Sequence, residues 1–178
     1  MQKDERKPNV DRRERRRPVK EVDPINSKLV SVNRVTKVVK GGRNMRFAAL
    51  VVAGDGKGRV GVGSGKAAEV PSAIDKATLA AKKAMVKVAL CDTTIPHEVV
   101  GVYGKSRVKL LPSKQGTGII AGGSVRPVVE LCGIKDITAK VYGSRNSTNI
   151  VKATINGLLQ LRTKEEVAAL RGKSVEEI

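Results

Sequence analysis

The sequence predicts an α+β fold made of two small units that each combine strands with helices. Apolar patterns typical of strands occur in two series along the chain, and amphipathic helical patterns accompany both series. The 178 residues, 40% of them hydrophobic, are enough for one medium domain or two small ones. We therefore expect a folded core, in a chain too short for a large multidomain enzyme.

The first unit is predicted to contain three strands. They are expected over residues 28–39, 47–53 and 59–65. A loop is expected over residues 40–46, and Asp55-Gly56 predicts a hairpin turn before the third strand. In that strand valines alternate with Gly61 and Gly63, so one face is bare backbone that a helix or RNA can approach closely.

Residues 71–88 carry the clearest helical pattern, with Pro71 suited to the first turn. The apolar stripe of this helix is predicted to consist of Ile74, Ala77, Ala81, Met85 and Val88. The opposite side carries the lysines Lys76, Lys83 and Lys87. Exposed lysines are usually only solvated, but no acidic residue follows Asp75 to pair with them, which favours contact with phosphate.

The second unit begins near residue 95 and alternates strands, glycine turns and helices. Strands are predicted over residues 98–103, 106–111 and 137–142, with a two-residue turn at Gly104-Lys105. A glycine-rich loop spans residues 116–123, and Ser124 is expected to cap a short helix that has Pro127 in its first turn and ends at Gly133. A last helix is predicted over residues 147–161. Capping-box spacings at Thr163 and Ser174 predict short helical turns in the tail.

These patterns divide the chain into four parts. They are a basic extension at 1–24, a first unit at 25–91, a second unit at 95–162 and a tail at 163–178. The extension contains five arginines between residues 12 and 17 and no apolar periodicity, so we expect it to be disordered until bound. It would serve either as a solubilising tail or as an RNA-contacting arm.

The charge balance indicates a polyanionic partner. The chain has 35 Lys and Arg against 17 Asp and Glu, a formal net charge of +18. Its only aromatic residues are Phe47, Tyr103 and Tyr142. Because proteins that read single strands rely on aromatic platforms, we expect a structured RNA that is read through its phosphates and shape.

Several classes are excluded by what the sequence lacks. No apolar run approaches the roughly 20 residues that span a bilayer, so we expect a cytoplasmic protein without a membrane partner. Cys91 and Cys132 form no CxxC motif and are expected to be buried, and His97 is the single histidine, so no cofactor, metal site or catalytic set is predicted. A GxGxxG pattern begins at Gly56, but a β-alternating stretch follows it where the dinucleotide motif requires a helix.

A series of motifs resembles the family of bacterial small-subunit ribosomal protein five. They are LVSVNRV at 29–35, VKGGR at 39–43, GDGKGRVG at 54–61, GKAAEVP at 65–71, GTGIIAGG at 116–123 and RGKSVEEI at 171–178. The resemblance covers residues 25–178. It implies a first domain similar to the double-stranded RNA-binding fold, with three strands and a helix (βββα), and a two-layer α/β domain with a left-handed crossover.

The resemblance also implies a function. It implies binding of small-subunit ribosomal RNA near the junction of body and head, a part in decoding accuracy, a position beside the path by which mRNA enters, and packing against small-subunit proteins four and eight. The residues expected to contact RNA are Lys37, Lys40, Gly41, Gly42, Arg43, Arg46, Lys57, Arg59, Lys66, Lys76, Lys83, Lys87, Arg107, Lys109, Lys114, Arg126 and Arg145. Those expected to contact partner proteins are Gly118, Gly122, Arg126, Arg171, Lys173, Glu176 and Glu177.

Three other interpretations are open at this point. The first is a free regulator or RNA chaperone that binds double-stranded RNA. The second is a nucleotide-dependent enzyme, which rests on the glycine motifs alone. The third is membrane-surface binding through residues 1–24, which carry a net positive charge.

Overall fold

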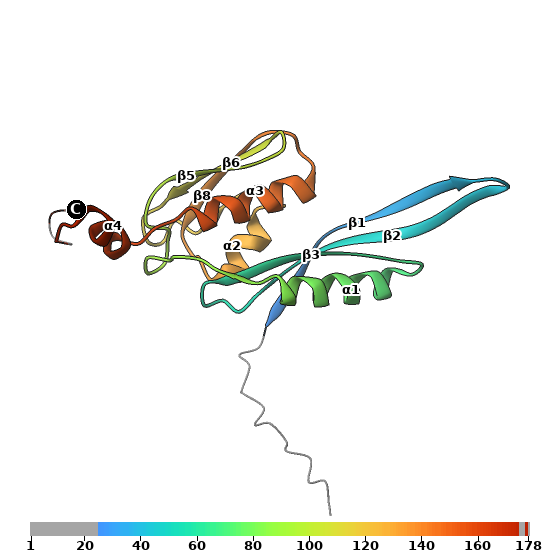
Figure 1. The fold of residues 1–178 in the computed structure, drawn as a ribbon, viewed down its shortest axis with the longest axis horizontal. Coiled ribbons are helices and arrows are strands. Elements are labelled where there is room, and N and C mark those ends of the chain that lie inside the picture. Colours follow the sequence, from blue (N-terminus) through green and yellow to red (C-terminus); the bar gives the residue numbers. More distant parts are fainter. Residues whose placement is uncertain (1–24, 175–176, 178) are drawn as a thin grey trace, which may run out of the picture.

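The computed structural model describes residues 25–174 and residue 177. The basic extension at 1–24, the predicted contact residue Glu176 and part of the second capping box lie outside the described residues. The described chain forms two four-stranded sheets with helices packed on them, which confirms the predicted α+β fold (Figure 1). Among the described residues, no helix combines the length and apolar character that a membrane span requires.

The first sheet is antiparallel throughout and is followed by one long helix. Its strands, in the spatial order β1-β2-β3-β4, are β1 (Asn26–Val39), β2 (Gly42–Gly54), β3 (Arg59–Ala67) and β4 (Val86–Lys87). The helix α1 (Val70–Lys83) packs on one face of this sheet. The three long strands and the helix reproduce the βββα arrangement that the family resemblance implies.

The predicted loop over residues 40–46 is wrong. Strands β1 and β2 pair as far as Val39 and Gly42, so only Lys40 and Gly41 form the turn, and Gly41 adopts a positive φ of 90°. Residues 33–47, here called the arm, form a two-stranded hairpin that projects from the body of the protein (Figure 1). Residues 42–46 of β2 are exposed, so this part of the strand needs no apolar side chains and apolar patterning does not reveal it.

The glycine face of β3 meets a helix. The alanines Ala73, Ala77 and Ala81 of α1 are fully buried against it. A Cβ atom added to Gly63 would lie 2.1 Å from the backbone oxygen of Ala77, so the strand and helix backbones approach as closely as glycine allows. Of the two predicted neighbours, a helix or RNA, the helix therefore occupies this face.

The predicted helix is too long at its C-terminal end. Helix α1 ends at Lys83, and the next residues turn back to pair with the edge of the sheet, with Val86 opposite Val60 and Lys87 opposite Arg59. Lys87 therefore lies on β4 and not on the lysine stripe with Lys76. Local helical periodicity continues past Lys83, but tertiary pairing with β3 ends the helix.

The second sheet mixes antiparallel and parallel pairs. Its strands, in the order β5-β6-β8-β7, are β5 (Val99–Tyr103), β6 (Ser106–Pro112), β7 (Ile119–Ile120) and β8 (Ile137–Gly143). The glycine-rich stretch predicted as a loop thus contains a short strand, β7, which runs parallel to β8. The helices are α2 (Arg126–Cys132), α3 (Ser147–Leu159) and α4 (Lys164–Arg171). Helix α2 connects β7 to β8, and the left hand implied for this crossover stays a prediction.

The helix ends agree only partly with the sequence analysis. Pro127 lies in the first turn of α2 and Gly133 ends it with a φ of 95°, as predicted, but Val125 and not Ser124 occupies the N-cap position. No side chain caps α2, because the oxygen of Gly122 accepts the N–H groups of Val125 and Arg126. Helix α3 ends two residues before the predicted position, and α4 begins with the predicted capping box.

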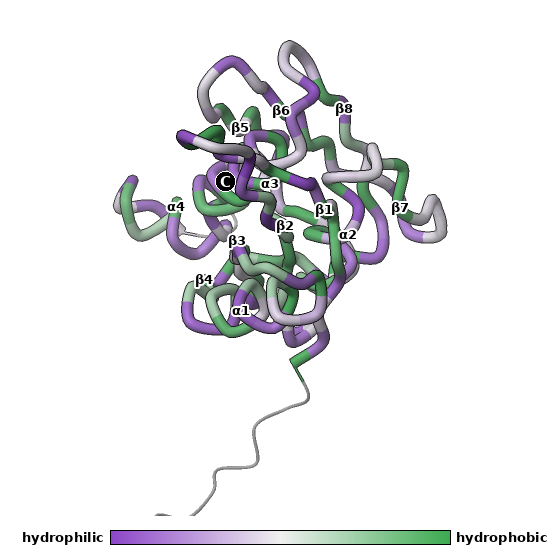
Figure 2. The backbone as a smooth tube through the Cα atoms, turned by 90° about the vertical axis from the view of Figure 1, so that its right-hand side faces the viewer, coloured by the Kyte–Doolittle hydropathy of each residue, from purple (hydrophilic) through white to green (hydrophobic). Residues whose placement is uncertain are grey.

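Helix α2 joins the two sheets into one core. Val128 and Val129 of α2 are fully buried in a cluster that contains Leu50, Val52 and Val60 of the first sheet together with core residues of the second. Figure 2 shows apolar segments gathered between the two sheets around this helix. The two predicted units therefore share a continuous hydrophobic interior.

The cysteines differ in their environments. Cys132 is buried as predicted, and burial raises the pKa of its thiol to about 12. Cys91 is exposed, so the prediction for it is wrong: it pairs with Thr94 in an isolated bridge within the connection between the two sheets. Neither thiol forms a disulfide.

We predict that Gly63→Ala destabilises the protein by at least about 2–3 kcal/mol, because the added Cβ collides with backbone that cannot move without separating α1 from the sheet. Urea unfolding measures the change. Gly123→Ala is the matched control, since no atom lies within 4 Å of its added Cβ, and it should unfold like the wild type. Equal stability of the two variants would contradict the close packing of α1 and β3.

Candidate RNA-binding surface

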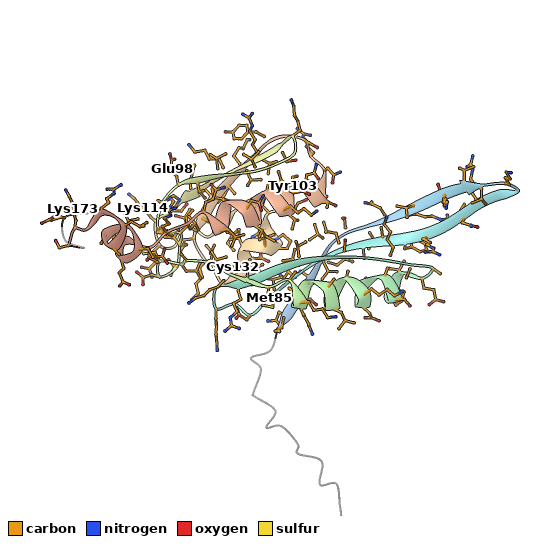
Figure 3. The ribbon with its side chains drawn as sticks, viewed as in Figure 1. Met85, Glu98, Tyr103, Lys114, Cys132 and Lys173 are labelled. Carbon is orange, nitrogen blue, oxygen red and sulfur yellow. The ribbon has the colours of Figure 1, made fainter. Side chains whose placement is uncertain are left out.

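The arm carries five cations at a constant spacing of three residues. They are Arg34, Lys37, Lys40, Arg43 and Arg46, and residues 25–54 contain no acidic residue. Residues 36–46 are all exposed. Figure 3 shows side chains projecting along both strands of the arm. The arm therefore concentrates positive charge on a narrow hairpin, and no acidic residue in the described part of the chain forms an ion pair with these five cations.

The spacing of three distributes the cations over both faces of the arm. Side chains on a strand alternate between faces with a period of two, so successive cations point to opposite sides. The register places Lys37 opposite Asn44 and Arg46 opposite Val35, which puts both cations on one face. Arg43, opposite Val38, lies on the other face with Arg34. The arm can consequently contact anions on two sides at once.

Both faces continue onto the body of the protein. Lys66 of β3 is exposed and lies opposite Ala48, on the same face of the sheet as Lys37 and Arg46. The opposite face packs against α1, whose Lys76 and Lys83 are exposed. The predicted residues Lys37, Lys40, Arg43, Arg46 and Lys66, with the glycines of the arm turn, thus form one region.

Other predicted RNA-binding residues lie elsewhere and pair with acids. Salt bridges join Arg59 to Asp55 at 3.6 Å, Lys109 to Glu98 at 3.2 Å and Arg126 to Glu130 at 3.0 Å. The cation of each pair is at least 38% exposed, and ion pairs at the surface contribute at most about 1 kcal/mol, so a phosphate can compete with the acid for the cation. Asp55 also shapes the β2–β3 turn, because its carboxylate accepts the backbone N–H groups of Lys57 and Arg59.

The remaining predicted cations are dispersed. Lys114 is exposed at the start of the glycine-rich stretch, and Arg107 is exposed on β6. Arg145 precedes α3 and lines a cavity of about 690 Å³ with Gly122 and Gly123. The structure therefore assembles the arm region from the predicted set and leaves the other cations on separate surfaces.

The predicted set of RNA-contacting residues leaves out several exposed cations, among them Arg34 and Lys140. Arg34 belongs to the arm, and the constant spacing of three residues is the signal that would have included it. Lys140 lies on β8 directly opposite Lys109 of β6. In the sequence, Lys140 alternates with Ala139 and Val141, which indicates that its side chain faces away from the core. That Lys109 is its neighbour on β6 depends on the register of the sheet and has no signal in the sequence.

The glycine-rich stretch predicted to contact a partner protein is held by a buried carboxylate. Asp136, 4% exposed, accepts the backbone N–H groups of Gly118 at 2.9 Å and Gly116 at 3.0 Å. The hydrogen bond from Gly118 is the main cause that lowers the pKa of Asp136, with further lowering by the Thr93 side chain and Gly116 against the opposing effect of burial. The conformation of this stretch thus depends on the ionised form of Asp136.

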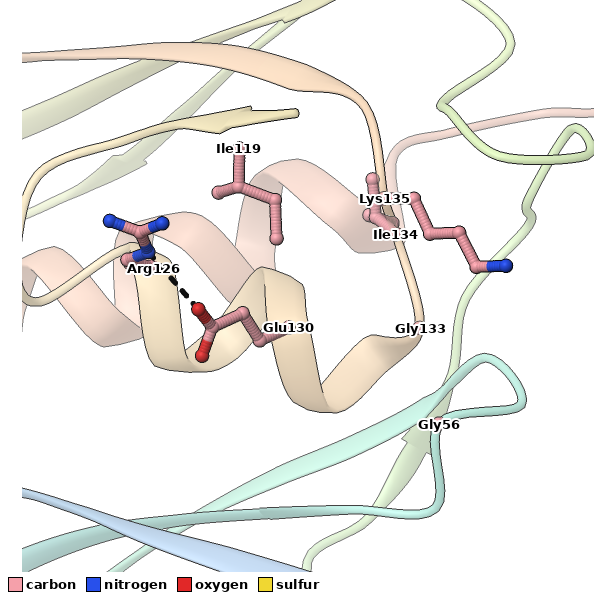
Figure 4. Close-up of a pocket in the computed structure, with 7 residues that line it drawn as sticks. All are labelled: Gly56, Ile119, Arg126, Glu130, Gly133, Ile134 and Lys135. Carbon is pink, nitrogen blue, oxygen red and sulfur yellow. Dashed lines mark hydrogen bonds and ion pairs between the residues drawn. The ribbon is translucent and has the colours of Figure 1, made fainter. Parts of the chain in front are cut away.

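Glu130 links helix α2 to the first sheet. Its carboxylate binds Arg126 within α2 and Lys28 of β1 (Figure 4 shows the pair with Arg126). The bond from Lys28 is the largest of the influences that lower the pKa of Glu130. Arg126, predicted to contact both RNA and a partner protein, and Glu130 line a shallow cavity of about 440 Å³ that also includes Ile119 and Gly56.

The tail residues predicted for a partner protein are only partly described. Arg171 lies in the last turn of α4, and Gly172 follows in the left-handed conformation with a φ of 62°. Lys173 and Glu177 are exposed. Within the part of the chain that the structure describes, no group of three or more His, Cys, Asp or Glu is placed to hold a metal ion.

Comparison with protein families gives two matches. The N-terminal domain of ribosomal protein S5 matches residues 25–89, and the C-terminal domain of ribosomal protein S5 matches residues 101–171. The first match contains the arm, the three long strands and α1. The second contains the second sheet with the glycine-rich stretch and helices α2 to α4.

We predict that Asp136→Asn lowers stability at neutral pH and flattens the loss of stability in acid. A lowered native pKa means that the ionised carboxylate stabilises the fold above the usual aspartate pKa of about 3.9, and that this contribution disappears as the pH falls through the native value. Melting temperatures measured from pH 7 to pH 2.5 test this. The exposed Asp75→Asn variant is the control and should follow the wild-type curve. Parallel curves for wild type and Asp136→Asn would contradict the assigned role.

Proposed function

Because the chain belongs to the ribosomal protein S5 family, we propose that it is a structural constituent of the bacterial 30S subunit. In this role its arm would hold segments of ribosomal RNA together. The family is one of structural ribosomal proteins, so the chain is an RNA-binding component of the small ribosomal subunit in translation. The observation that carries the proposal is the set of five arm cations on both faces of the hairpin, with no acidic residue among them.

The geometry of the arm supports insertion between RNA segments. Paired residues from Asn33 to Val39 on β1 extend it by about 20 Å at the usual rise of roughly 3.3 Å per residue. A hairpin with cations on a single face would suit one RNA surface, whereas cations on two faces suit two converging surfaces. Each phosphate that is neutralised releases counterions, which provides the favourable free energy of association.

The site of action is part of the proposal. We propose that the arm reaches the RNA near the junction of body and head, that the protein contributes to translational accuracy, and that it lies beside the path by which mRNA enters. The charge distribution supports this, because a protein that only covered an RNA surface would need cations on one side. No catalytic step is proposed, and the protein is expected to work on cytoplasmic ribosomes.

Two protein contacts are also proposed. The stretch containing Gly118, Gly122 and Arg126 would contact small-subunit protein four, and the tail with Arg171, Lys173 and Glu177 would contact protein eight. In support of the first, Asp136 fixes the backbone of this stretch before binding, so less conformational entropy is lost on association. On this proposal residues 25–91 form an RNA-binding domain, and residues 95–162 form a domain that binds both RNA and protein. Residues 163–178 form a tail that contacts a partner protein.

We predict that replacing all five arm cations by glutamine sharply weakens binding of small-subunit ribosomal RNA. The slope of log affinity against log salt should fall by roughly four to five, since each of the five lost phosphate contacts removes about 0.9. Filter binding at several salt concentrations measures both quantities. Lys164→Gln on α4, at the opposite end of the molecule from the arm (Figure 1), is the control and should bind like the wild type.

Sedimentation separates this proposal from a free RNA-binding regulator. The wild-type chain should co-migrate with 30S particles and the five-fold arm variant should be depleted from them. A wild-type chain that stays in the soluble fraction, or an arm variant with an unchanged salt slope, would overturn the proposal.

A further inference from the structure

The outer face of the second sheet carries a second cluster of cations. Residues that lie directly opposite one another share a face, so the register defines two rows across strands β5, β6 and β8. One row consists of Val102, Arg107 and Tyr142, and the other of Val100, Lys109 and Lys140. The alternate residues of the same strands, among them Val108, Leu110 and Ile137, are buried in the core. The rows therefore lie on the face that the core does not cover.

One pairing on this face is unfavourable in the free protein. Lys109 and Lys140 are directly opposite each other on neighbouring antiparallel strands, where like charges destabilise a sheet. Glu98 pairs with Lys109 at 3.2 Å, but its side chain is 65% exposed. A local arrangement that costs stability without serving the core is typical of a binding site. An anion between the two lysines would turn the repulsion into attraction.

The face also offers a stacking platform. Tyr142 is 53% exposed, and Val100 and Val102 are each 46% exposed, so the cations lie beside apolar surface. Tyr142 is one of only two tyrosines in the chain and is directly opposite Arg107. Sheets that bind nucleotides commonly combine an exposed aromatic ring for a base with cations for the phosphates.

We propose that the outer face of the second sheet binds an RNA segment of its own, with a backbone phosphate between Lys109 and Lys140 and an unstacked base on the ring of Tyr142. The inference rests on the proposed ribosomal function and adds to it a second RNA contact, separate from the arm. The residues assigned to this contact are Lys109, Lys140 and Tyr142, together with Arg107, which lies opposite Tyr142.

The position of the face makes this contact independent of the arm. Strands β5, β6 and β8 lie on one side of the molecule, helices α2 and α3 lie beneath them, and the sheet that carries the arm lies beyond (Figure 1). The shared core holds the two sheets in fixed relation. The protein would therefore hold two RNA segments at a set separation.

The test uses the full-length chain and small-subunit ribosomal RNA. The variants are Lys109→Ala with Lys140→Ala, then Tyr142→Ala, Tyr142→Phe, the five-fold arm variant and Lys164→Gln as control. The double lysine variant should lower the salt slope of binding by about one, because the two lysines share one phosphate. Tyr142→Ala should weaken binding by about five-fold or more, as expected for loss of base stacking, and Tyr142→Phe should restore it. Hydroxyl-radical footprinting should show that the lysine and arm variants lose protection of different nucleotides.

Stability of the free protein distinguishes a binding role from a structural one. Lys140→Ala alone should raise the melting temperature by roughly 1–4 °C, because it removes the repulsion with Lys109. If Lys140 is part of a binding site, the Lys140→Ala variant should be more stable than the wild type and bind RNA more weakly. If Lys140 has a structural role, the variant should be less stable.

Three results would overturn the inference. The first is an outer-face variant with wild-type RNA affinity and footprint while the arm variant fails, which leaves the proposed function intact. The second is an outer-face variant that keeps its RNA affinity but loses binding to a purified small-subunit protein, which would make this face a protein interface. The third is a wild-type chain that does not bind the RNA, which would refute the proposed function as well.

Discussion

The body end of the first sheet is covered on both faces, by α1 on one side and by α2 on the other. On one face, glycines of β3 let α1 approach to backbone contact, and on the other, Val52 and Val60 pack against α2. Each fully buried valine contributes about 1.5–3 kcal/mol. At the α2 end the backbones also meet, since a Cβ at Gly54 would lie 2.2 Å from the oxygen of Leu131. This double contact makes two family domains one rigid support.

Rigidity of the body is what gives the charged surfaces a defined geometry. The arm has no core of its own, and beyond the body it is held by the hydrogen bonds of a two-stranded ribbon. Such a ribbon is only marginally stable alone, so the sheet at its base must fix its direction. Its cations repel one another in the free protein, and that repulsion becomes favourable when phosphates surround the arm.

Four of the acidic residues in the body have structural tasks. Asp55 shapes the β2–β3 turn, Asp136 holds the glycine-rich stretch, Glu130 ties α2 to β1 and Glu166 completes the capping box of α4. Each acid accepts hydrogen bonds from backbone or from a neighbouring cation at a point where the chain changes direction or two elements meet. The arm contains no acidic residue, and its Lys40-Gly41 turn forms without an acidic side chain. The positive surplus is therefore concentrated where the protein is least constrained by its own fold.

The α+β class, the glycine face of β3 and the excess of cations could be predicted from the sequence, because they follow from local periodicity and composition. The strand at residues 42–46, the end of α1 at Lys83 and the position of Lys140 opposite Lys109 became known from the fold. Each of these depends on pairing between strands, in which Gly42 lies opposite Val39, Val86 opposite Val60 and Lys140 opposite Lys109. Backbone hydrogen bonds between strands form whether the side chains are polar or apolar, so an exposed strand need not carry an apolar pattern. The residue that lies opposite another across two strands is set by the register of their pairing.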